Sequence, residues 1–327
     1  MRPMKVFIYP ENECRRIASG ISGLRFPPGS YEPVSDPEAA DAILCPVPLT
    51  AMPEAKDLHR LRWYSGELRQ RHVFLDVSDC PDATEREAGR FVYEGEPATF
   101  LRCNVRTWMR EAASNTVCLG WPVGKADLDA IAEGPFDPTH DVGFHGWNTS
   151  SQARIDSVAA IVFGDRAGIF RADVVARDEF YGYVHRDRPS EAALMRANFL
   201  RSMARCRIQL CPQSIHGVLP YRFLETLCAA RVPLLFWSDG VFPLDGLDLP
   251  GGPIPWSDIA FVRPAEEASR ATDIVHEILY GFPDWKLGRM GENGRKWFMR
   301  WLDDRHWPKI HREIVEIALR GRGVLKP

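Results

Sequence analysis

Short apolar runs alternate with helical patterns along most of the 327-residue chain, and this alternation constrains the fold more than any other feature. Strands are expected at 5–9, 42–46, 72–77, 99–103 and 116–119, and again at 141–145, 168–172, 207–210, 232–236 and 259–262. Helices are expected at 151–162, 190–205, 221–230 and 266–281, and residues 291–319 indicate one or two amphipathic helices. Such a pattern is typical of parallel α/β layers.

A loop rich in Pro, Gly and Asp at 124–141 separates the two sets of strands. A chain of this length favours two domains, because a typical domain has about 100–200 residues. We therefore place the domain boundary in this loop.

Composition limits the partners. The chain is 45% hydrophobic and 26% charged with a net charge of −3, which gives no general attraction to nucleic acid or anionic membranes. Its eight cysteines form no CxxC pair and lie in or beside apolar runs, as expected of buried thiols in a reducing compartment. The start MRPMKVFIYP has no signal-peptide pattern, and no apolar run reaches about 18 residues. A cytoplasmic protein without a transmembrane segment is expected, and peripheral membrane association is left open.

Several motifs with a defined chemistry do not occur. There is no GxGxxG after the first expected strand, and no GxxxxGK[ST], HExxH or GxSxG anywhere. Nicotinamide oxidoreductases, P-loop enzymes, zinc proteases and serine hydrolases are therefore disfavoured. Twin α/β domains with a cleft between them would suit a nucleotide-linked substrate.

The stretch GVLPYRFLETLCAARVPLLFWSDG at 217–240 places two charges at the start of an otherwise apolar segment. Pro220 is suited to a helix start, and the apolar run 232–237 predicts a buried parallel strand. Arg222 and Glu225 would lie one helical turn apart on the same side. They could be an ordinary solvated ion pair or part of a binding site.

The block from Arg201 to Asp239 resembles the exostosin-like glycosyltransferases of family 47. The similarity rests on Leu210-Cys211-Pro212, Arg222-Phe223-Leu224-Glu225, Val232-Pro233-Leu234 and Ser238-Asp239, with VGFHGW at 142–147, Arg154, and HVFLDVSD at 72–79. The chain departs from the family pattern at Ala230-Arg231, where the family has Gly-Cys, and at Gln213-Ser214, where it has Arg-Gly. Phe223 and Leu224 are also transposed.

This resemblance implies an α/β protein of the GT-B type, with two Rossmann-like domains facing across a cleft. Together with the boundary above, it predicts an acceptor domain at 1–125 and a nucleotide-sugar-binding domain at 126–304. Helices at about 305–327 would return to the first domain.

The implied activity is transfer of a sugar from a nucleotide diphosphate sugar, with UDP favoured, to a hydroxyl of a glycan or glycoconjugate, as in polysaccharide biosynthesis. The outcome is expected to be inversion. The DxD sequence Asp127-Leu128-Asp129 falls in the expected interdomain loop rather than after a strand, and Asp245 and Asp248 also lie in an expected loop. We therefore expect no cofactor and no essential divalent metal.

The donor would bind where the second set of strands ends. Arg222 and the nearby backbone N–H groups would hold the diphosphate, and Glu225 would accept hydrogen bonds from ribose hydroxyls. Further donor-site candidates are Gly146, which would let backbone approach phosphate, and His145, Ser150, Ser151 and Arg154. The alternatives are a plain strand-to-helix turn at 146–151 and a structural histidine.

A general base for the acceptor hydroxyl is expected in the first domain. Asp79 is the preferred candidate, followed by Asp76 and Glu94, although an Asp in Ser-Asp-Cys-Pro is also an ordinary turn residue. Trp121, Trp147 and Trp237 are candidates to stack on a sugar or base, or else belong to the core.

Two rival functions stay open from the sequence. One is a fucosyltransferase-like GT-B enzyme that uses a GDP-sugar, and the other is a noncatalytic module that binds a sugar nucleotide or a glycan. A Rossmann oxidoreductase is the least favoured, because the glycine fingerprint does not occur.

Overall fold

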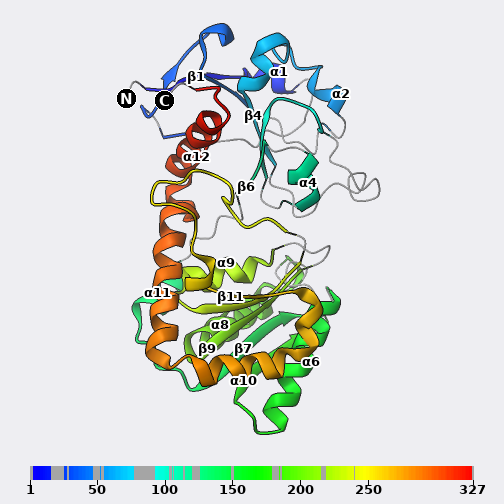
Figure 1. Cartoon of the computed structure of the whole chain (residues 1–327), viewed down its shortest axis with the longest axis vertical. Helices are drawn as coiled ribbons and strands as arrows, with labels where there is room; N and C mark the ends of the chain where they lie inside the picture. The colour runs from blue at the N-terminus through cyan, green and yellow to red at the C-terminus, as the bar shows by residue number, and fades with distance from the viewer. Residues whose placement is uncertain are drawn as a thin grey trace. The chain divides into compact units, whose positions relative to one another are not determined.

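The computed structural model divides into two compact units, Met1–Pro122 with Asp239–Ile254 and Asp304–Pro327, and Val123–Ser238 with Pro255–Asp303 (Figure 1). The structure describes residues 3–15, 26–27, 29–46, 52, 55–76, 93–102, 105, 107–112, 115–119, 126–148, 151–178, 184, 186–214, 219–238 and 240–325.

The first unit is built on a parallel sheet with the strand order β2-β1-β3-β4-β5-β6. Its strands are β1 (Lys5–Ile8), β2 (Glu32–Pro33), β3 (Ala42–Cys45), β4 (His72–Asp76), β5 (Thr99–Arg102) and β6 (Thr116–Cys118). Its helices are α1 (Glu11–Arg15), α2 (Ala55–Leu58), α4 (Thr107–Ala112) and α12 (Trp307–Gly321), with short 3-10 turns η1 (Pro37–Ala39), η3 (Gly66–Arg71) and η7 (Asp304–His306). Every residue of β3 and β5 is buried, as expected for parallel strands covered on both faces.

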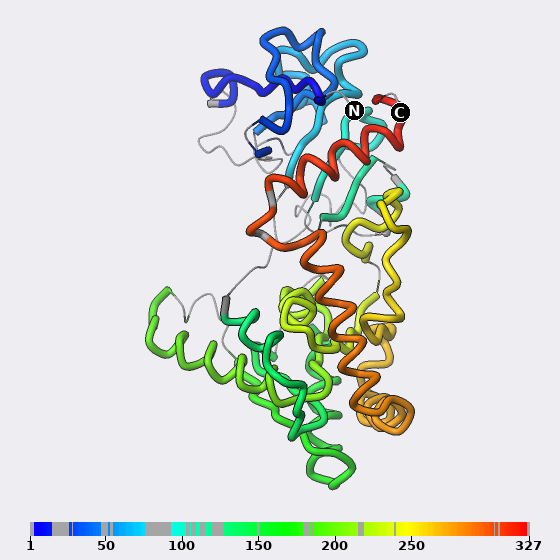
Figure 2. Tube along the Cα trace, turned by 90° about the vertical axis from the view of Figure 1, so that its left-hand side faces the viewer, coloured from blue at the N-terminus to red at the C-terminus, as the bar shows by residue number. Residues whose placement is uncertain are grey.

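Two segments that are distant in sequence complete this unit. The C-terminal helix α12 buries Ile310, Ile314 and Leu319 and returns to the first unit, where both chain ends lie (Figure 2). The segment 239–254 also belongs to it, because Val241 N donates to Val105 O at 2.9 Å and Leu244 N to Cys118 O at 2.7 Å. The sequence-based range 126–304 had included this segment in the second domain.

The second unit contains a parallel sheet with the order β11-β10-β9-β7-β8. Its strands are β7 (His140–Trp147), β8 (Ala172–Arg177), β9 (Cys206–Pro212), β10 (Val232–Phe236) and β11 (Phe261–Arg263). Its helices are α5 (Ala126–Glu133), α6 (Gln152–Arg166), α8 (Pro189–Arg205), α9 (Tyr221–Cys228), α10 (Ala271–Gly281) and α11 (Asp284–Trp301), with 3-10 turns η5 (Trp256–Asp258) and η6 (Ala265–Arg270). The expected pair of Rossmann-like α/β domains is confirmed.

Helices cover both faces of the second sheet. Phe144 belongs to the same buried hydrophobic cluster as Ala153 and Val158 of α6, whereas the neighbouring Gly143 faces Ser202 of α8. Successive residues of a strand point to opposite faces, so α6 and α8 lie on opposite sides of the sheet. A Cβ at Gly143 would lie 2.7 Å from Ser202 Oγ, so glycine permits the close approach of α8.

Two expectations about local structure were wrong. The strand expected at 168–172 is instead β8 at Ala172–Arg177, because α6 extends to Arg166 and Gly168 forms a turn with a φ of 70°. The expected loop 124–141 contains the helix α5, whose Leu128 is fully buried. Local composition favoured a loop, but burial of this side chain and ion pairs described below stabilise the helix.

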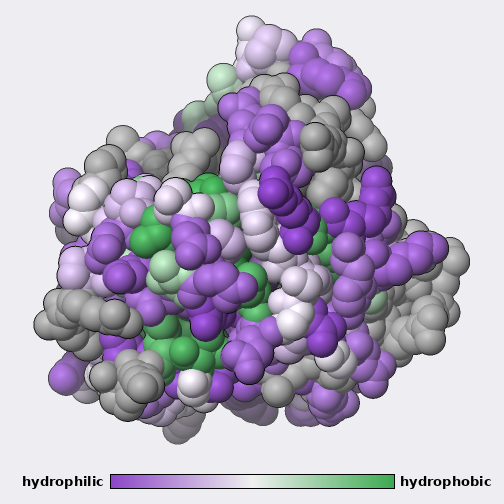
Figure 3. Space-filling view, turned by 90° about the horizontal axis from the view of Figure 1, so that it is seen from above, coloured by the Kyte–Doolittle hydropathy of each residue, from purple (hydrophilic) through white to green (hydrophobic). Residues whose placement is uncertain are grey.

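Among the coloured residues visible from above, hydrophilic ones predominate, with small hydrophobic areas between them (Figure 3). Among the described helices, none is both long enough and apolar enough to cross a membrane.

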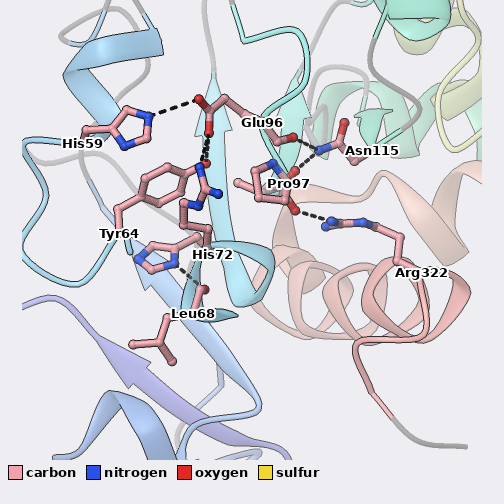
Figure 4. Close-up of polar contacts among 10 residues, drawn as sticks. His59, Tyr64, Leu68, His72, Glu96, Pro97, Asn115 and Arg322 are labelled. Atoms are coloured by element: carbon pink, nitrogen blue, oxygen red, sulfur yellow. Dashed lines mark hydrogen bonds and ion pairs between the residues drawn. The ribbon is translucent and has the colours of Figure 1, made fainter. Parts of the chain in front are cut away.

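A polar cluster lies in the first unit beside the beginning of β4 and β5 (Figure 4). The Glu96 carboxylate accepts from the Tyr64 hydroxyl at 2.8 Å and lies 3.2 Å from His59 Nε2. Arg322, just after α12, donates to the Pro97 carbonyl. This contact fixes the end of the C-terminal helix to the first unit.

His72, the first residue of β4, is completely buried. Its Nδ1 donates to Leu68 O at 2.8 Å, and the Tyr9 hydroxyl lies 2.9 Å from its Nε2. Burial lowers the pKa of His72 to about 4, so the ring is neutral in the folded protein at neutral pH. Burial raises the pKa of the Tyr9 hydroxyl, so this group keeps its proton and can donate it to Nε2 of His72.

We expect this histidine to make the protein less stable in mild acid. The unfolded chain takes up a proton at His72 below about pH 6.5, whereas the folded chain does so only near its depressed pKa. The free energy of unfolding should therefore fall by roughly 2 kcal/mol from this residue between about pH 7 and pH 5. Urea unfolding across this range would measure it. His72→Gln, although less stable overall, should show a shallower slope, and an unchanged slope would contradict the assignment.

Candidate functional site

The carboxyl edge of the second sheet brings together three strand ends and two helix starts. Strands β7, β9 and β10 are parallel neighbours, so their carboxyl ends meet at one edge. Helix α6 follows β7 and α9 follows β9, so both helices begin there. The first backbone N–H groups of a helix lack partners within the helix, and its N-terminus carries partial positive charge. This edge is therefore suited to anions.

The two helix starts differ in their capping. Ser151 caps α6, because its Oγ accepts from Arg154 N at 3.2 Å and donates to Gln213 O at 2.8 Å. Pro220 precedes α9 with extended backbone and makes no side-chain capping bond. The first N–H groups of α9 thus receive no acceptor from their own N-cap side chain.

Arg222, in the first turn of α9, reaches across to the end of β7. Its Nη2 donates to the His145 carbonyl, and its guanidinium lies 4.4 Å from the Phe144 ring centroid and 5.3 Å from that of Phe199. Burial lowers the pKa of this guanidinium. Within the described part of the chain, its Nε has no hydrogen-bond partner.

Arg154 of α6 joins the ends of β7 and β9. Its Nη1 donates to Trp147 O at 3.0 Å and its Nη2 to Pro212 O at 3.3 Å. Burial, with the nearby charge of Arg222, lowers the pKa of Arg154 to about 9. Its Nε also has no partner among the described residues.

The site therefore holds two desolvated guanidinium groups that repel each other. The hydrogen bonds described for both go to backbone carbonyls, and no described carboxylate lies within ion-pair distance of either. A buried charge without a counter-charge is costly, so a bound anion with two or more negative charges would be strongly attracted. The geometry favours a polyanion beside the starts of α6 and α9.

Gly146 lies against the Arg222 guanidinium. A Cβ at this position would overlap the Nη2 of Arg222, so the absence of a side chain lets the guanidinium reach β7. The sequence analysis assigned Gly146 to close approach of a phosphate. In the structure the group beside it is the arginine that would hold such an anion.

The partner of the His145 ring is Asp173 rather than Arg154 or Arg222. Its Nε2 lies 3.1 Å from Asp173 Oδ1, and Asp173 Oδ2 lies 2.8 Å from Arg205 Nη2. Burial lowers the pKa of His145 despite the carboxylate. The hydrogen bonds from His145 and Arg205 outweigh burial at Asp173, whose pKa is below its usual value. The backbone carbonyl of His145, rather than its ring, contacts Arg222.

Glu225 is 6% exposed and forms no described ion pair with Arg222, the alternative that the sequence had left open. Its Oε1 accepts from Nη1 of Arg196 on α8. The same guanidinium binds Asp127 of α5, with Nε 2.9 Å from Oδ2 and Nη2 3.2 Å from Oδ1. Sequence reasoning missed Arg196, because no spacing along the chain links it to either carboxylate.

The DxD aspartates serve as helix anchors. Asp127 binds Arg196, and Asp129 Oδ1 lies 2.9 Å from Nη2 of Arg295 on α11. Asp245 accepts from Arg110 in the first unit at 2.5 Å. No group of three or more His, Cys, Asp or Glu side chains in the described ranges could hold a metal ion.

Several remaining candidates cannot be placed at this site. Asp79, Ser150 and Trp121 lie outside the described residues. Asp76 ends β4 and Glu94 is an exposed turn residue, both in the first unit. Trp237, just after β10, is 7% exposed and belongs to the buried residues of the second unit.

Buried Arg231 offers a matched comparison with Arg222. It donates to the Met203, Ala229 and Ile131 carbonyls, which lie at or near the ends of α8, α9 and α5. A cation among helix C-termini is stabilised by the helix dipoles, whereas Arg222 lies at a helix start, where the dipole opposes it.

We therefore expect opposite effects of the same substitution on stability. Arg222→Met should leave the free energy of unfolding within about 1 kcal/mol of wild type or raise it, because it removes a desolvated charge that forms no described ion pair. Arg231→Met should lower it by about 2 kcal/mol or more, because several buried carbonyls lose their donor. Urea unfolding without added anions would measure both, and equal losses would show that Arg222 is a structural residue.

The sequence matches no family model, and no curated protein is detectably similar to it. Among solved structures, the chain is similar to sucrose-phosphate synthase from Thermosynechococcus elongatus, with 10% identity, 99% of this chain and 100% of that chain covered, and a TM-score of 0.44. Anabaena HepE in complex with UDP-glucose has 10% identity, 96% and 98% coverage and a TM-score of 0.46. A glycosyltransferase from Rickettsia africae has 11% identity, 81% and 74% coverage and a TM-score of 0.42. At such low scores, what the site binds must be inferred from its own residues.

Proposed function

We propose that this chain is a glycosyltransferase of the GT-B type, which transfers a sugar from a nucleotide diphosphate sugar to a hydroxyl of a glycan or glycoconjugate. The observation that carries the proposal is the pair Arg154 and Arg222, two partly buried arginines beside two helix starts. Neither has a described carboxylate partner, and the Nε of each is buried without a hydrogen bond among the described residues. A diphosphate supplies the multiple negative charge and the acceptor oxygens that this pair lacks.

The same arginines would assist bond breaking. During transfer, the bond between the sugar C1 and the diphosphate oxygen breaks, its electron pair stays on the diphosphate, and the acceptor oxygen bonds to C1. Negative charge therefore grows on the leaving group. Donors held in place by burial stabilise that charge more strongly in the transition state than in the bound substrate.

Glu225 would bind the nucleoside part of the donor. It lies one turn after Arg222 on α9 and is almost completely buried. In such a dry environment, a carboxylate oxygen accepts strongly from hydroxyl groups. We assign it to the ribose hydroxyls, with UDP as the favoured nucleotide.

The general base that activates the acceptor hydroxyl is assigned from the sequence. Asp79 of the first unit would take the proton of the acceptor hydroxyl as that oxygen attacks C1 from the face opposite the diphosphate. This attack gives inversion at C1, and the acceptor proton ends on the carboxylate.

A nucleotide-release screen tests the transferase activity. Incubation with UDP-, GDP- and CMP-sugars should release UDP from a UDP-sugar, because donor hydrolysis proceeds slowly even without the acceptor. Arg222→Met should reduce release by about 100-fold or more, since it removes one donor to the leaving group. Arg300→Met, an exposed arginine stacked on Trp301, is the matched control and should keep wild-type release.

The outcomes separate the rival functions. Release from a GDP-sugar alone would identify the donor as GDP-linked. Nucleotide binding detected by thermal shift, without any nucleotide release, would indicate a binding module. If the protein neither binds a nucleotide nor releases one, the proposal is rejected.

We also expect release to persist without divalent metal. Arg154 and Arg222 already supply positive charge at the leaving group, as a metal ion does in other transferases. Release in EDTA should therefore stay within about twofold of release in Mg²⁺, a difference below about 0.5 kcal/mol in activation free energy. A loss of activity in EDTA that Mn²⁺ or Mg²⁺ restores would show that a metal ion is required.

A further inference from the structure

Arg196 of α8 connects two carboxylates that come from different helices. One edge of its guanidinium, Nε and Nη2, binds both oxygens of Asp127 on α5 at 2.9 and 3.2 Å. Its remaining Nη1 donates to Oε1 of Glu225 on α9. A planar guanidinium held by two parallel bonds on one edge has little freedom to rotate, so the direction of Nη1 is fixed.

Charge strengthens this arrangement. Burial alone would lower the pKa of Arg196, but the hydrogen bonds and charges of Asp127 and Glu225 raise it above its usual value. The guanidinium therefore stays charged throughout the pH range in which proteins are folded. Two carboxylates, from α5 and α9, share this one cation.

The same region contains the link to Arg222. The Phe199 ring centroid lies 5.2 Å from the Arg196 guanidinium carbon and 5.3 Å from that of Arg222. One aromatic ring, 8% exposed, thus contacts the cation assigned to the diphosphate and the cation that holds Glu225. The spacing between these two groups is fixed by packing, as a single ligand that spans both would require.

The second carboxylate oxygen of Glu225, Oε2, takes no part in the bond to Arg196. Within the described residues, its side chain makes one hydrogen bond, from Arg196 to Oε1. The Oε2 lone pairs are therefore available to other donors, and the carboxylate cannot turn away without breaking the bond to Arg196.

We propose that Arg196 is a positioning residue, which with Asp127 holds the Glu225 carboxylate so that its second oxygen accepts from the ribose diol of the nucleotide. This inference rests on the proposed function, because it assigns the diol to Glu225. Arg196 acts through Glu225 and does not contact the nucleotide itself.

Discrimination between UDP and 2′,3′-dideoxy-UDP tests the inference, because the second ligand lacks both ribose hydroxyls. Isothermal titration should show that wild type binds UDP at least about tenfold more tightly than the dideoxy form. In Arg196→Gln and in Asp127→Asn this ratio should fall to about one to three, as the carboxylate is released. The same titrations with GDP and 2′,3′-dideoxy-GDP test the inference in case the donor is a GDP-sugar.

Asp129→Asn is the matched control, because it makes the same change two residues along α5 and breaks the ion pair with Arg295 instead. It should keep the wild-type ratio. A residue of merely structural importance would weaken both ligands equally and leave the ratio unchanged, and thermal melting reports folding of each variant separately. Asp127→Asn keeps the experiment decisive if Arg196→Gln does not fold.

The failures are distinguishable. A wild-type protein that binds UDP but does not discriminate would overturn the diol assignment and this inference, while leaving the anion site intact. Binding of neither nucleotide would overturn the proposed function and the inference together. Wild-type discrimination that persists in both variants would overturn the inference alone.

Discussion

The parallel pairing of β7, β9 and β10 is the constraint on which the candidate site depends. Because these strands run in one direction, their carboxyl ends and the starts of α6 and α9 are forced to one edge. That edge then receives Arg154 and Arg222 from two helices far apart in the chain. Without parallel pairing, the fold would not bring the two guanidiniums close together.

Four arginines of the second unit, of which Arg231 is buried and the others are partly buried, fall into two groups by their surroundings. Arg231 lies among helix C-termini and Arg196 among carboxylates, so their charges are compensated within the protein. The hydrogen bonds described for Arg154 and Arg222 go only to carbonyls, and the charge of Arg222 adds to the cost of burying Arg154. Two desolvated cations close together and without a described ion pair are features often found at binding sites, where stability is reduced in favour of function.

The helix α5 shows how an acidic motif can be misinterpreted from its spacing. An Asp-x-Asp sequence can hold a metal, but here Asp127 and Asp129 each bind an arginine from another helix. Two ion pairs attach α5 to α8 and α11, and through Arg196 the first of them reaches Glu225. The motif therefore anchors α5, and its first aspartate supports the position of Glu225 through Arg196.

The sequence by itself determined the α/β class, the start of α9 after Pro220 and the strand Val232–Phe236, because proline geometry and apolar runs act over a few residues. It also selected Arg154, Arg222 and Glu225, but not their partners. Only the tertiary structure decided that Arg222 binds the His145 carbonyl, 77 residues away, and that Glu225 binds Arg196, 29 residues away. The physical reason is that local patterns fix which residues a helix or strand contains, whereas hydrogen-bond partners depend on which strand ends the sheet places side by side.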